Sequence, residues 1–126
     1  MKKQLAEYLL KEMEVNKDIF LVTADLGYGA GDEIRDKYPN RFLNTGASEQ
    51  AAIGICVGLA LEKKIPIFYS ISTFALLRAF ETIRNYLHHE HIPVKIVGNG
   101  RQKDYHIDVY SHWPLEQLQI LNLLDI

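Results

Sequence analysis

The sequence is poor in the features that mark secreted and membrane proteins. It holds one cysteine in 126 residues, so a disulfide cannot form within the chain, and Cys56 lies in an apolar run typical of a core. No apolar stretch reaches the roughly 18 residues that a membrane-spanning helix needs. Residues Met1 to Glu14 carry too many charges for a secretory signal. These shortages predict a cytoplasmic protein with no membrane partner.

An excess of charge of either sign is also missing. The chain has 14 Lys and Arg against 16 Asp and Glu, which gives a net charge of -2. Basic residues do not cluster with aromatic residues as they do on nucleic-acid-binding surfaces, so we expect no nucleic-acid partner. With 48% hydrophobic residues, the composition suits a single domain over residues 1–126.

The sequence does contain a regular alternation of strand-like and helix-like segments. Runs of β-branched and aromatic residues predict strands, and apolar residues at intervals of three or four predict helices. The expected strands are 19–23, 41–44, 66–71 and 93–97. The expected helices are 3–14, 32–38, 50–61 and 115–123, together with a long helix that starts at Ser72 or Thr73 and includes Leu87. This order favours a three-layer α/β/α fold with a largely parallel sheet.

Single residues refine these helices. Asp32 and Ser48 are expected to cap the helices that follow them, and Pro114 suits the first turn of the last helix. Gly54 and Gly58 lie one turn apart in helix 50–61. They leave a smooth face, which predicts close packing against another backbone.

Four loops follow the carboxyl ends of the expected strands, where parallel sheets bind ligands. Short motifs occur in or beside these loops in a fixed order: Ala24-Asp25-Leu26, Arg41-Phe42, Gly46-Ala47-Ser48-Glu49-Gln50, Ser72-Thr73-Phe74, Arg78-Ala79-Phe80, Val97-Gly98-Asn99-Gly100, and Ser111-His112 before Pro114-Leu115-Glu116. From about Leu21 to Leu124 the chain thereby resembles the pyrimidine-binding domain of transketolases and deoxyxylulose-phosphate synthases. The resemblance implies the ThDP-binding Pyr-domain fold and thiamine diphosphate as the cofactor.

The resemblance assigns the central chemistry to Glu49. In this family a glutamate pairs with pyrimidine N1′ of the cofactor, and the cofactor's own amino group can then take the proton from C2. Such a glutamate needs a dry, apolar setting, which we expect from the Ala, Ile and Gly residues that follow it. By position alone, Glu49 would be an exposed first-turn carboxylate that favours the helix dipole.

Three residues after the third strand match family positions around the cofactor. Phe74 matches the ring that packs against the aminopyrimidine, although core packing is the alternative. For Phe80, pocket lining and core packing are equally supported. Arg78 matches an arginine beside the pocket in the synthase branch, while its neighbours also fit a solvated helix face.

Three further residues match transketolase positions by resemblance. Asp25 matches an aspartate at the interface around the cofactor, with capping of the next turn as the alternative. Asp108 and His112 match residues that contact the sugar near its reacting carbons, so His112 is expected to be catalytic as well as substrate-binding. A histidine in a polar loop can equally be a surface residue.

The family's metal-binding pattern is missing. Transketolases hold the diphosphate through Mg²⁺ with a Gly-Asp-Gly segment and a later asparagine, whereas Gly31-Asp32 is not followed by glycine. His88, His89 and His91 do not share one helix face and are expected at a surface helix end. We therefore expect no metal ligands in this chain, and a partner chain whose diphosphate-binding domain holds Mg²⁺.

The implied activity is transfer of a two-carbon ketol unit between sugar phosphates, by a homo- or hetero-oligomer. The family continues beyond the last helix, so the chain is expected to be a subunit of a split enzyme, a truncated piece or a remnant. A synthase-like carboligase half is one alternative. A non-catalytic interaction or regulatory module is another. Val109-Tyr110 and Trp113 depart from the transketolase pattern around His112 and bear on sugar specificity.

Overall fold

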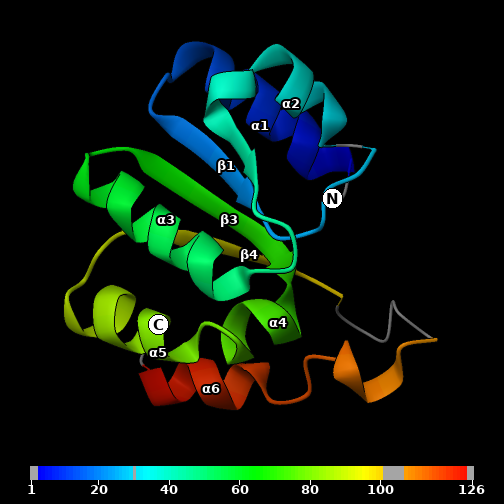
Figure 1. Cartoon of the computed structure of the whole chain (residues 1–126), viewed down its shortest axis with the longest axis vertical. Coiled ribbons are helices and arrows are strands. Elements are labelled where there is room, and N and C mark those ends of the chain that lie inside the picture. Colours follow the sequence, from blue (N-terminus) through cyan, green and yellow to red (C-terminus); the bar gives the residue numbers. More distant parts are fainter. Residues whose placement is uncertain (1–2, 30, 101–106, 125–126) are drawn as a thin grey trace.

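The structure, a computed structural model, describes residues 3–29, 31–100 and 107–124 (Figure 1). Four parallel strands form one sheet in the order β2-β1-β3-β4. The strands are β1 (Ile19–Thr23), β2 (Phe42–Asn44), β3 (Ile65–Ile71) and β4 (Lys95–Asn99). The helices are α1 (Lys3–Val15), α2 (Asp32–Lys37), α3 (Glu49–Leu61), α4 (Ser72–Leu77), α5 (Phe80–Thr82) and α6 (Gln117–Leu124), with 3-10 turns η1 (Pro39–Arg41) and η4 (Val109–Ser111) and a π-helical segment η2 (Ile83–His89). The predicted α/β fold is confirmed.

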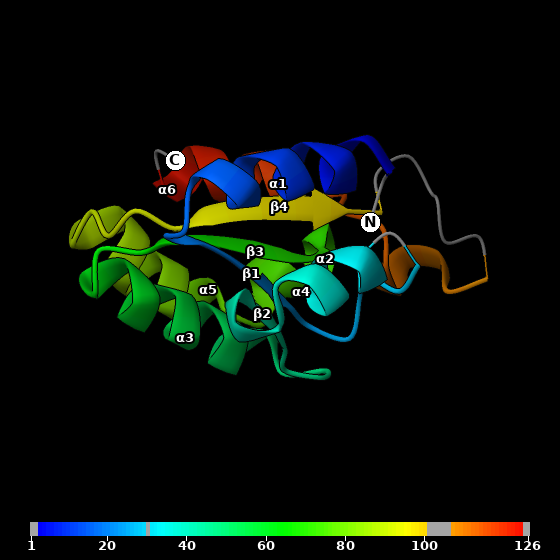
Figure 2. The ribbon, with the colours of Figure 1, turned by 90° about the horizontal axis from the view of Figure 1, so that it is seen from above.

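Hydrophobic side chains form a core on each face of the sheet. On one face Leu9 and Met13 of α1 pack with Leu21 of β1. On the other, Ile53 of α3 packs with Phe68 of β3 and with residues of α4, η2 and α6. Alternate residues of a strand point to opposite faces, so the central strands β1 and β3 supply both cores. Figure 2 shows α1 and α3 on opposite sides of the sheet.

Cys56 belongs to the core between α3 and the sheet, as expected. Its side chain is fully buried, and burial raises the pKa of its thiol to about 12. A thiol in this setting is a small apolar group rather than a nucleophile. In the described part of the chain, no helix is long and apolar enough to cross a membrane.

The prediction of one long helix after β3 is wrong. The chain instead forms α4, a turn at Arg78 and Ala79, the short α5 and then η2. Ala79 adopts φ -109° and ψ 12°, outside the α-helical values, while its side chain stays buried. The interruption keeps Ala79 and Ile83 in the core and lets Arg78 point elsewhere.

Of the predicted capping residues, Ser48 alone occupies the expected position. Gly31 is the N-cap of α2, so Asp32 lies in the first turn, where its carboxylate accepts from the Gly29 N–H and from Arg35. Ser48 is at the N-cap of α3 but makes no side-chain capping bond. Ile71 rather than Ser72 is the N-cap of α4. The Ser72 hydroxyl donates to the Asn99 carbonyl at 3.0 Å.

Segment boundaries differ at the second and last strands and at the last helix. Arg41 belongs to η1 rather than to β2, because its guanidinium donates to the carbonyl oxygens of Met13 and Asn16. The last strand begins at Lys95, two residues later than predicted, where pairing with β3 starts. Pro114 precedes α6 and is not in its first turn.

The smooth face predicted for α3 is present but uncovered in this chain. Side-chain atoms added at Gly54 or Gly58 would meet nothing within 4 Å. Ile55 and Leu61 on the same side are exposed by 39% and 64%. The expected close backbone packing is therefore not made within the described residues, and Figure 1 shows α3 in front of the sheet.

Candidate functional site

The loops after the four strands meet at one edge, because all strands run parallel. Asn44 ties two of these loops together: its side-chain oxygen accepts from the Asp25 N–H at 3.1 Å and from the Gly46 N–H at 3.0 Å. Gly46 has φ 66°, a left-handed conformation that suits glycine. The Thr45 hydroxyl donates to the Thr23 carbonyl at 3.2 Å. These bonds fix where α3 begins.

Glu49 stands in the first turn of α3, and its side chain is only 3% exposed. A buried carboxylate requires a donor or a cation beside it. Arg78 supplies both, with Nη1 2.8 Å from Oε2 of Glu49. The predicted burial is confirmed, but the surroundings are not only apolar, because a guanidinium faces the carboxylate.

The same guanidinium lies over the ring of Phe74. The Arg78 Cζ atom is 3.7 Å from the ring centroid, a cation–π contact. The turn after α4 lets Arg78 reach Phe74 in the preceding helix and Glu49 in α3 at the same time. Arg78 is therefore half-exposed yet bonded at its charged end, rather than free on a solvated helix face.

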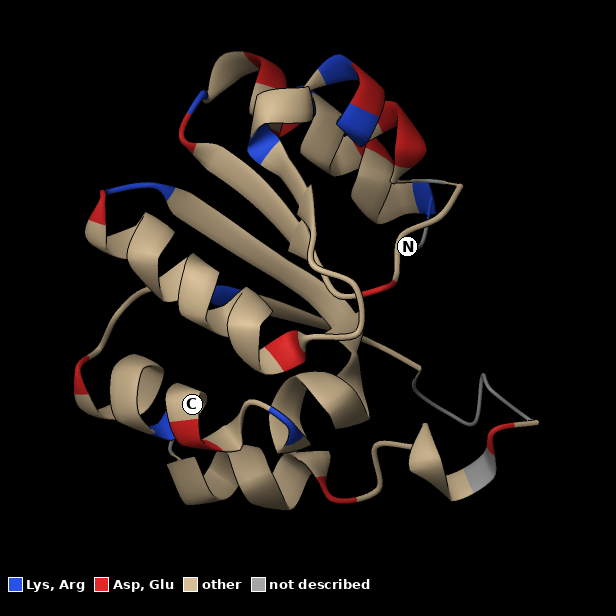
Figure 3. Ribbon diagram, viewed as in Figure 1, with Lys and Arg blue, Asp and Glu red and all other residues tan. Residues whose placement is uncertain are grey.

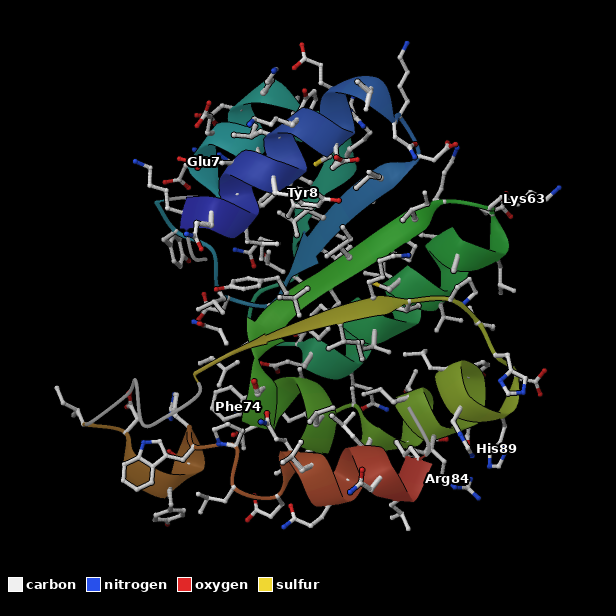
Figure 4. The ribbon with its side chains drawn as sticks, turned by 180° about the vertical axis from the view of Figure 1, so that it is seen from behind. Glu7, Tyr8, Lys63, Phe74, Arg84 and His89 are labelled. Carbon is white, nitrogen blue, oxygen red and sulfur yellow. The ribbon has the colours of Figure 1, made fainter. Side chains whose placement is uncertain are left out.

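His112 also contacts the ring of Phe74. The two rings meet edge to face, with centroids 4.8 Å apart. Figure 4 shows Phe74 on α4 beside the segment that contains η4. The His112 side chain is 21% exposed, so it is not a freely solvated loop residue.

A short polar chain orients His112. The Ser111 hydroxyl donates to the Asp108 carbonyl at 2.6 Å and lies 2.9 Å from Nδ1 of His112. A hydroxyl has one proton, so in this arrangement Nδ1–H donates to Ser111. The other ring nitrogen, Nε2, lies 4.0 Å from the Asp108 carboxylate. We call Glu49, Arg78, Phe74 and His112 the strand-end cluster.

Two predicted site residues lie apart from the strand-end cluster. Asp25 is exposed with φ 47°, and its carboxylate accepts from the Tyr28 hydroxyl at 3.2 Å. This hydrogen bond, together with the negative charge of Asp25, raises the pKa of Tyr28. Phe80 packs against the core near α3 and lines a surface hollow with Arg84 and His88. The core interpretation of Phe80 is therefore favoured over pocket lining.

Sequence reasoning missed two polar residues at this edge. Asn44 organises the loops, and an asparagine at a strand end is a signal that could have identified it. Ser70 on β3 is 1% exposed, and its hydroxyl has no hydrogen-bond partner among the residues described. A serine in an apolar strand gives no such signal.

Charge is distributed unevenly around the site. Figure 3 shows Lys, Arg, Asp and Glu mainly on α1, α2 and the loops, whereas α3 is charged only at its start. Within residues 3–29, 31–100 and 107–124, no group of three or more His, Cys, Asp and Glu is placed to hold a metal ion. The strand-end cluster suits a flat ligand with a hydrogen-bond donor that faces the Glu49 carboxylate.

Comparisons with known proteins give matches over most of the chain. Residues 1–125 match the family model described as "Transketolase, pyrimidine binding domain". The chain is 33% identical over 125 residues to the "Putative transketolase C-terminal section" of Methanocaldococcus jannaschii, covering 98% of this chain and 40% of that protein. It is 34% identical over 93 residues to the 1-deoxy-D-xylulose-5-phosphate synthase of Trichormus variabilis, covering 73% of this chain and 14% of that protein.

A solved structure has the same fold. It is described as "Split gene transketolase, inactive beta4 tetramer" and matches with a TM-score of 0.77 at 30% identity. The match covers 94% of this chain and 39% of the solved chain. This chain therefore spans about two fifths of the length of these transketolase relatives.

Proposed function

The chain belongs to the transketolase family as its pyrimidine-binding domain, and on this premise we propose that it binds and activates the aminopyrimidine ring of thiamine diphosphate for ketol transfer between sugar phosphates. One observation carries the proposal. The buried carboxylate of Glu49 and the ring of Phe74 face the same flat guanidinium. A carboxylate and an aromatic face around a planar group are what an aminopyrimidine requires.

Thiamine diphosphate, when bound, supplies an acidic carbon and an electron sink for cleavage of the bond beside a ketone. The chain's residues prepare that chemistry. Glu49 would hold a proton at pyrimidine N1′, in a position shielded from water by its burial. Phe74 would fix the plane of the ring by stacking.

His112 and Asp108 are proposed to act on the sugar. The imidazole of His112 lies between the Ser111 hydroxyl and the Asp108 carboxylate, and an imidazole is a side chain that can exchange protons with a sugar hydroxyl. Asp108 is exposed beside it and can accept from a sugar hydroxyl. Asp25 and Phe80 remain predictions as cofactor contacts, and Phe80 has the weaker support because it packs against the core and lines a different surface hollow. Arg78 remains a prediction as a residue beside the cofactor pocket.

A partner chain is proposed to supply the diphosphate-binding domain and Mg²⁺. The similarity to a protein named a transketolase C-terminal section and to a split-gene transketolase supports this, because those names place parts of the enzyme on separate chains. The uncovered face of α3 gives an apolar surface for such a partner or for a second copy. The related split-gene transketolase forms a tetramer, which supports an oligomer here.

A synthase-like carboligase half is the second candidate, supported by the identity to deoxyxylulose-phosphate synthases. The two activities share the pyrimidine site and differ in donor. Assays of the assembled enzyme with a ketose phosphate and with pyruvate as donor distinguish them. A chain that binds the cofactor with its partner but turns over neither donor would instead act as a non-catalytic module.

Calorimetry with thiamine diphosphate and Mg²⁺ tests the proposal. The chain alone should bind thiamine diphosphate more weakly than a micromolar dissociation constant, which corresponds to a binding free energy of about -8 kcal/mol. The reason is that the diphosphate end of the cofactor meets no group of metal ligands among the described residues. Addition of the partner should bring tight binding. Tight binding by the chain alone would contradict the proposed division of labour, and no binding with the partner would contradict the proposed function.

A further inference from the structure

Arg78 fills the two contact surfaces that the proposed function assigns to the cofactor. Its guanidinium is 2.8 Å from the Glu49 carboxylate and stacks 3.7 Å from the Phe74 centroid. A ring bound between the same carboxylate and the same ring face would need the space that the guanidinium occupies. Cofactor and arginine are therefore competitors in this arrangement.

The guanidinium has the properties needed of such a stand-in. It is flat, it donates hydrogen bonds in its own plane, and it stacks on aromatic faces. Its positive charge balances a carboxylate that is 3% exposed, which would otherwise be buried without a partner. The free chain can thus keep Glu49 buried before any ligand arrives.

Arg78 is also placed where it can leave. It belongs to the turn between α4 and α5, so its movement does not require a helix to unwind. Its side chain is 46% exposed, in contrast to the carboxylate that it contacts. A long side chain at this position can rotate toward solvent while Ala79 stays in the core.

We propose that Arg78 is an internal placeholder for the aminopyrimidine ring, which occupies the Glu49–Phe74 site in the free chain and is displaced when the ring binds. This inference rests on the proposed function, because it takes Glu49 and Phe74 as the ring's contacts. Arg78 then lowers the affinity for the ring, and it pairs with the Glu49 carboxylate when no ring is bound.

The probe that tests this is the hydroxymethyl aminopyrimidine half of thiamine, which carries no diphosphate and so needs neither Mg²⁺ nor a partner. NMR titration of the full chain compares wild type, Arg78→Gln and the control Arg84→Gln. Arg84 is an exposed arginine of η2 that bonds only locally to Asn85 in the described contacts. Arg78→Gln should bind roughly three- to tenfold more tightly, and Arg84→Gln should match wild type.

The guanidinium signals of Arg78 in the wild-type chain give a second measurement that does not depend on a variant folding. Stacking on Phe74 should shift them away from those of solvated arginines, and the pyrimidine should return them to solvated positions. Arg78→Lys keeps the charge but loses the flat stack, and it should bind with intermediate affinity.

The outcomes separate the two proposals. If wild type binds the pyrimidine but the Arg78 signals do not move, or if Arg78→Gln binds more weakly, the placeholder is overturned and the proposed function stands. If neither wild type nor Arg78→Gln binds the pyrimidine, while the assembled Glu49→Gln enzyme exchanges the C2 proton of bound cofactor at the wild-type rate, the proposed function fails with it.

Discussion

The two ends of α3 reverse the usual relation between polarity and burial. At its start, the charged Glu49 is 3% exposed. Further along, the apolar Ile55 and Leu61 are 39% and 64% exposed, beside Gly54 and Gly58, where an added Cβ atom would meet nothing within 4 Å. Apolar residues normally lie inside and carboxylates outside, so both ends of this helix depart from the pattern in opposite directions.

The difference indicates two kinds of missing partner. A buried charge is tolerated only where a specific group meets it, and here an arginine of the same chain does so. An exposed small apolar face has no such substitute within the described chain and needs another surface. The start of α3 therefore suits a small flat ligand, and its outer face, defined by Ala51, Gly54, Ile55, Gly58 and Leu61, suits a protein.

Replacing Glu49 should have the largest effect, and it should change turnover without changing assembly. In the assembled enzyme, Glu49→Gln should lower turnover by a factor of roughly 10² to 10⁴, because an amide cannot hand a proton to N1′. Assembly, which depends on the outer face, should not change. Steady-state kinetics and sedimentation of the same sample measure both. A variant that loses assembly along with turnover would count against this separation.

A charge on the outer face should have the converse effect. Ile55→Glu should weaken association with the partner or a second copy by roughly tenfold to a hundredfold, because an unpaired charge in an interface is costly. The control is Tyr8→Glu on α1, also an exposed apolar residue, labelled in Figure 4. Sedimentation equilibrium compares them. Equal association of both variants would exclude the outer face as the interface.

Removing the cation at the start of α3 should destabilise the free chain. Arg78→Met leaves the Glu49 carboxylate buried without its partner, which should cost about 1–2 kcal/mol of unfolding free energy after allowance for the half-exposed arginine. Arg84→Met should change it by less than about 0.5 kcal/mol. Urea unfolding measures the difference, and equal values for the two variants would show that the ion pair carries no stability.

The smallest effect is expected for the thiol of Cys56, in the middle of α3. Burial raises the pKa of Cys56 to about 12, so the thiol should stay un-ionised and unreactive in the folded chain. Iodoacetamide should not label it at about pH 8, where an ordinary thiol near pKa 8.5 reacts, and labelling should appear only on unfolding. Mass spectrometry with and without denaturant tests this; labelling of the native chain would show that α3 opens.

The sequence predicted much of this arrangement because strand and helix patterns are local. The bounds of β1 were predicted correctly, and α3 begins one residue earlier than expected. The break at Ala79 was not predictable from spacing, because Leu76, Ile83 and Leu87 fit one continuous helical stripe. Tertiary contacts of Arg78 and Ala79 decide that turn.

The resemblance assigned Glu49 and Phe74 to the cofactor and His112 to the sugar, and these roles stay predictions. The structure brings the three side chains into one cluster, whereas their contacts could not be predicted from the sequence. The ion pair between Glu49 and Arg78 joins residues 29 apart in the sequence, and no local pattern reports such a pairing. For Phe80 the sequence left core packing and pocket lining equally supported, because a helical stripe does not distinguish them, and the structure packs this ring against the core.

The most direct test of the central claim is the exchange rate of the C2 proton of thiamine diphosphate bound to the assembled enzyme. Turnover combines several steps, whereas C2 exchange reports cofactor activation alone. Glu49→Gln should slow the exchange by roughly 10² to 10⁴, while the unfolding free energy changes by only about 1 kcal/mol. Exchange at the wild-type rate in a folded Glu49→Gln enzyme would contradict the account, because Glu49 would then not be the activating acid.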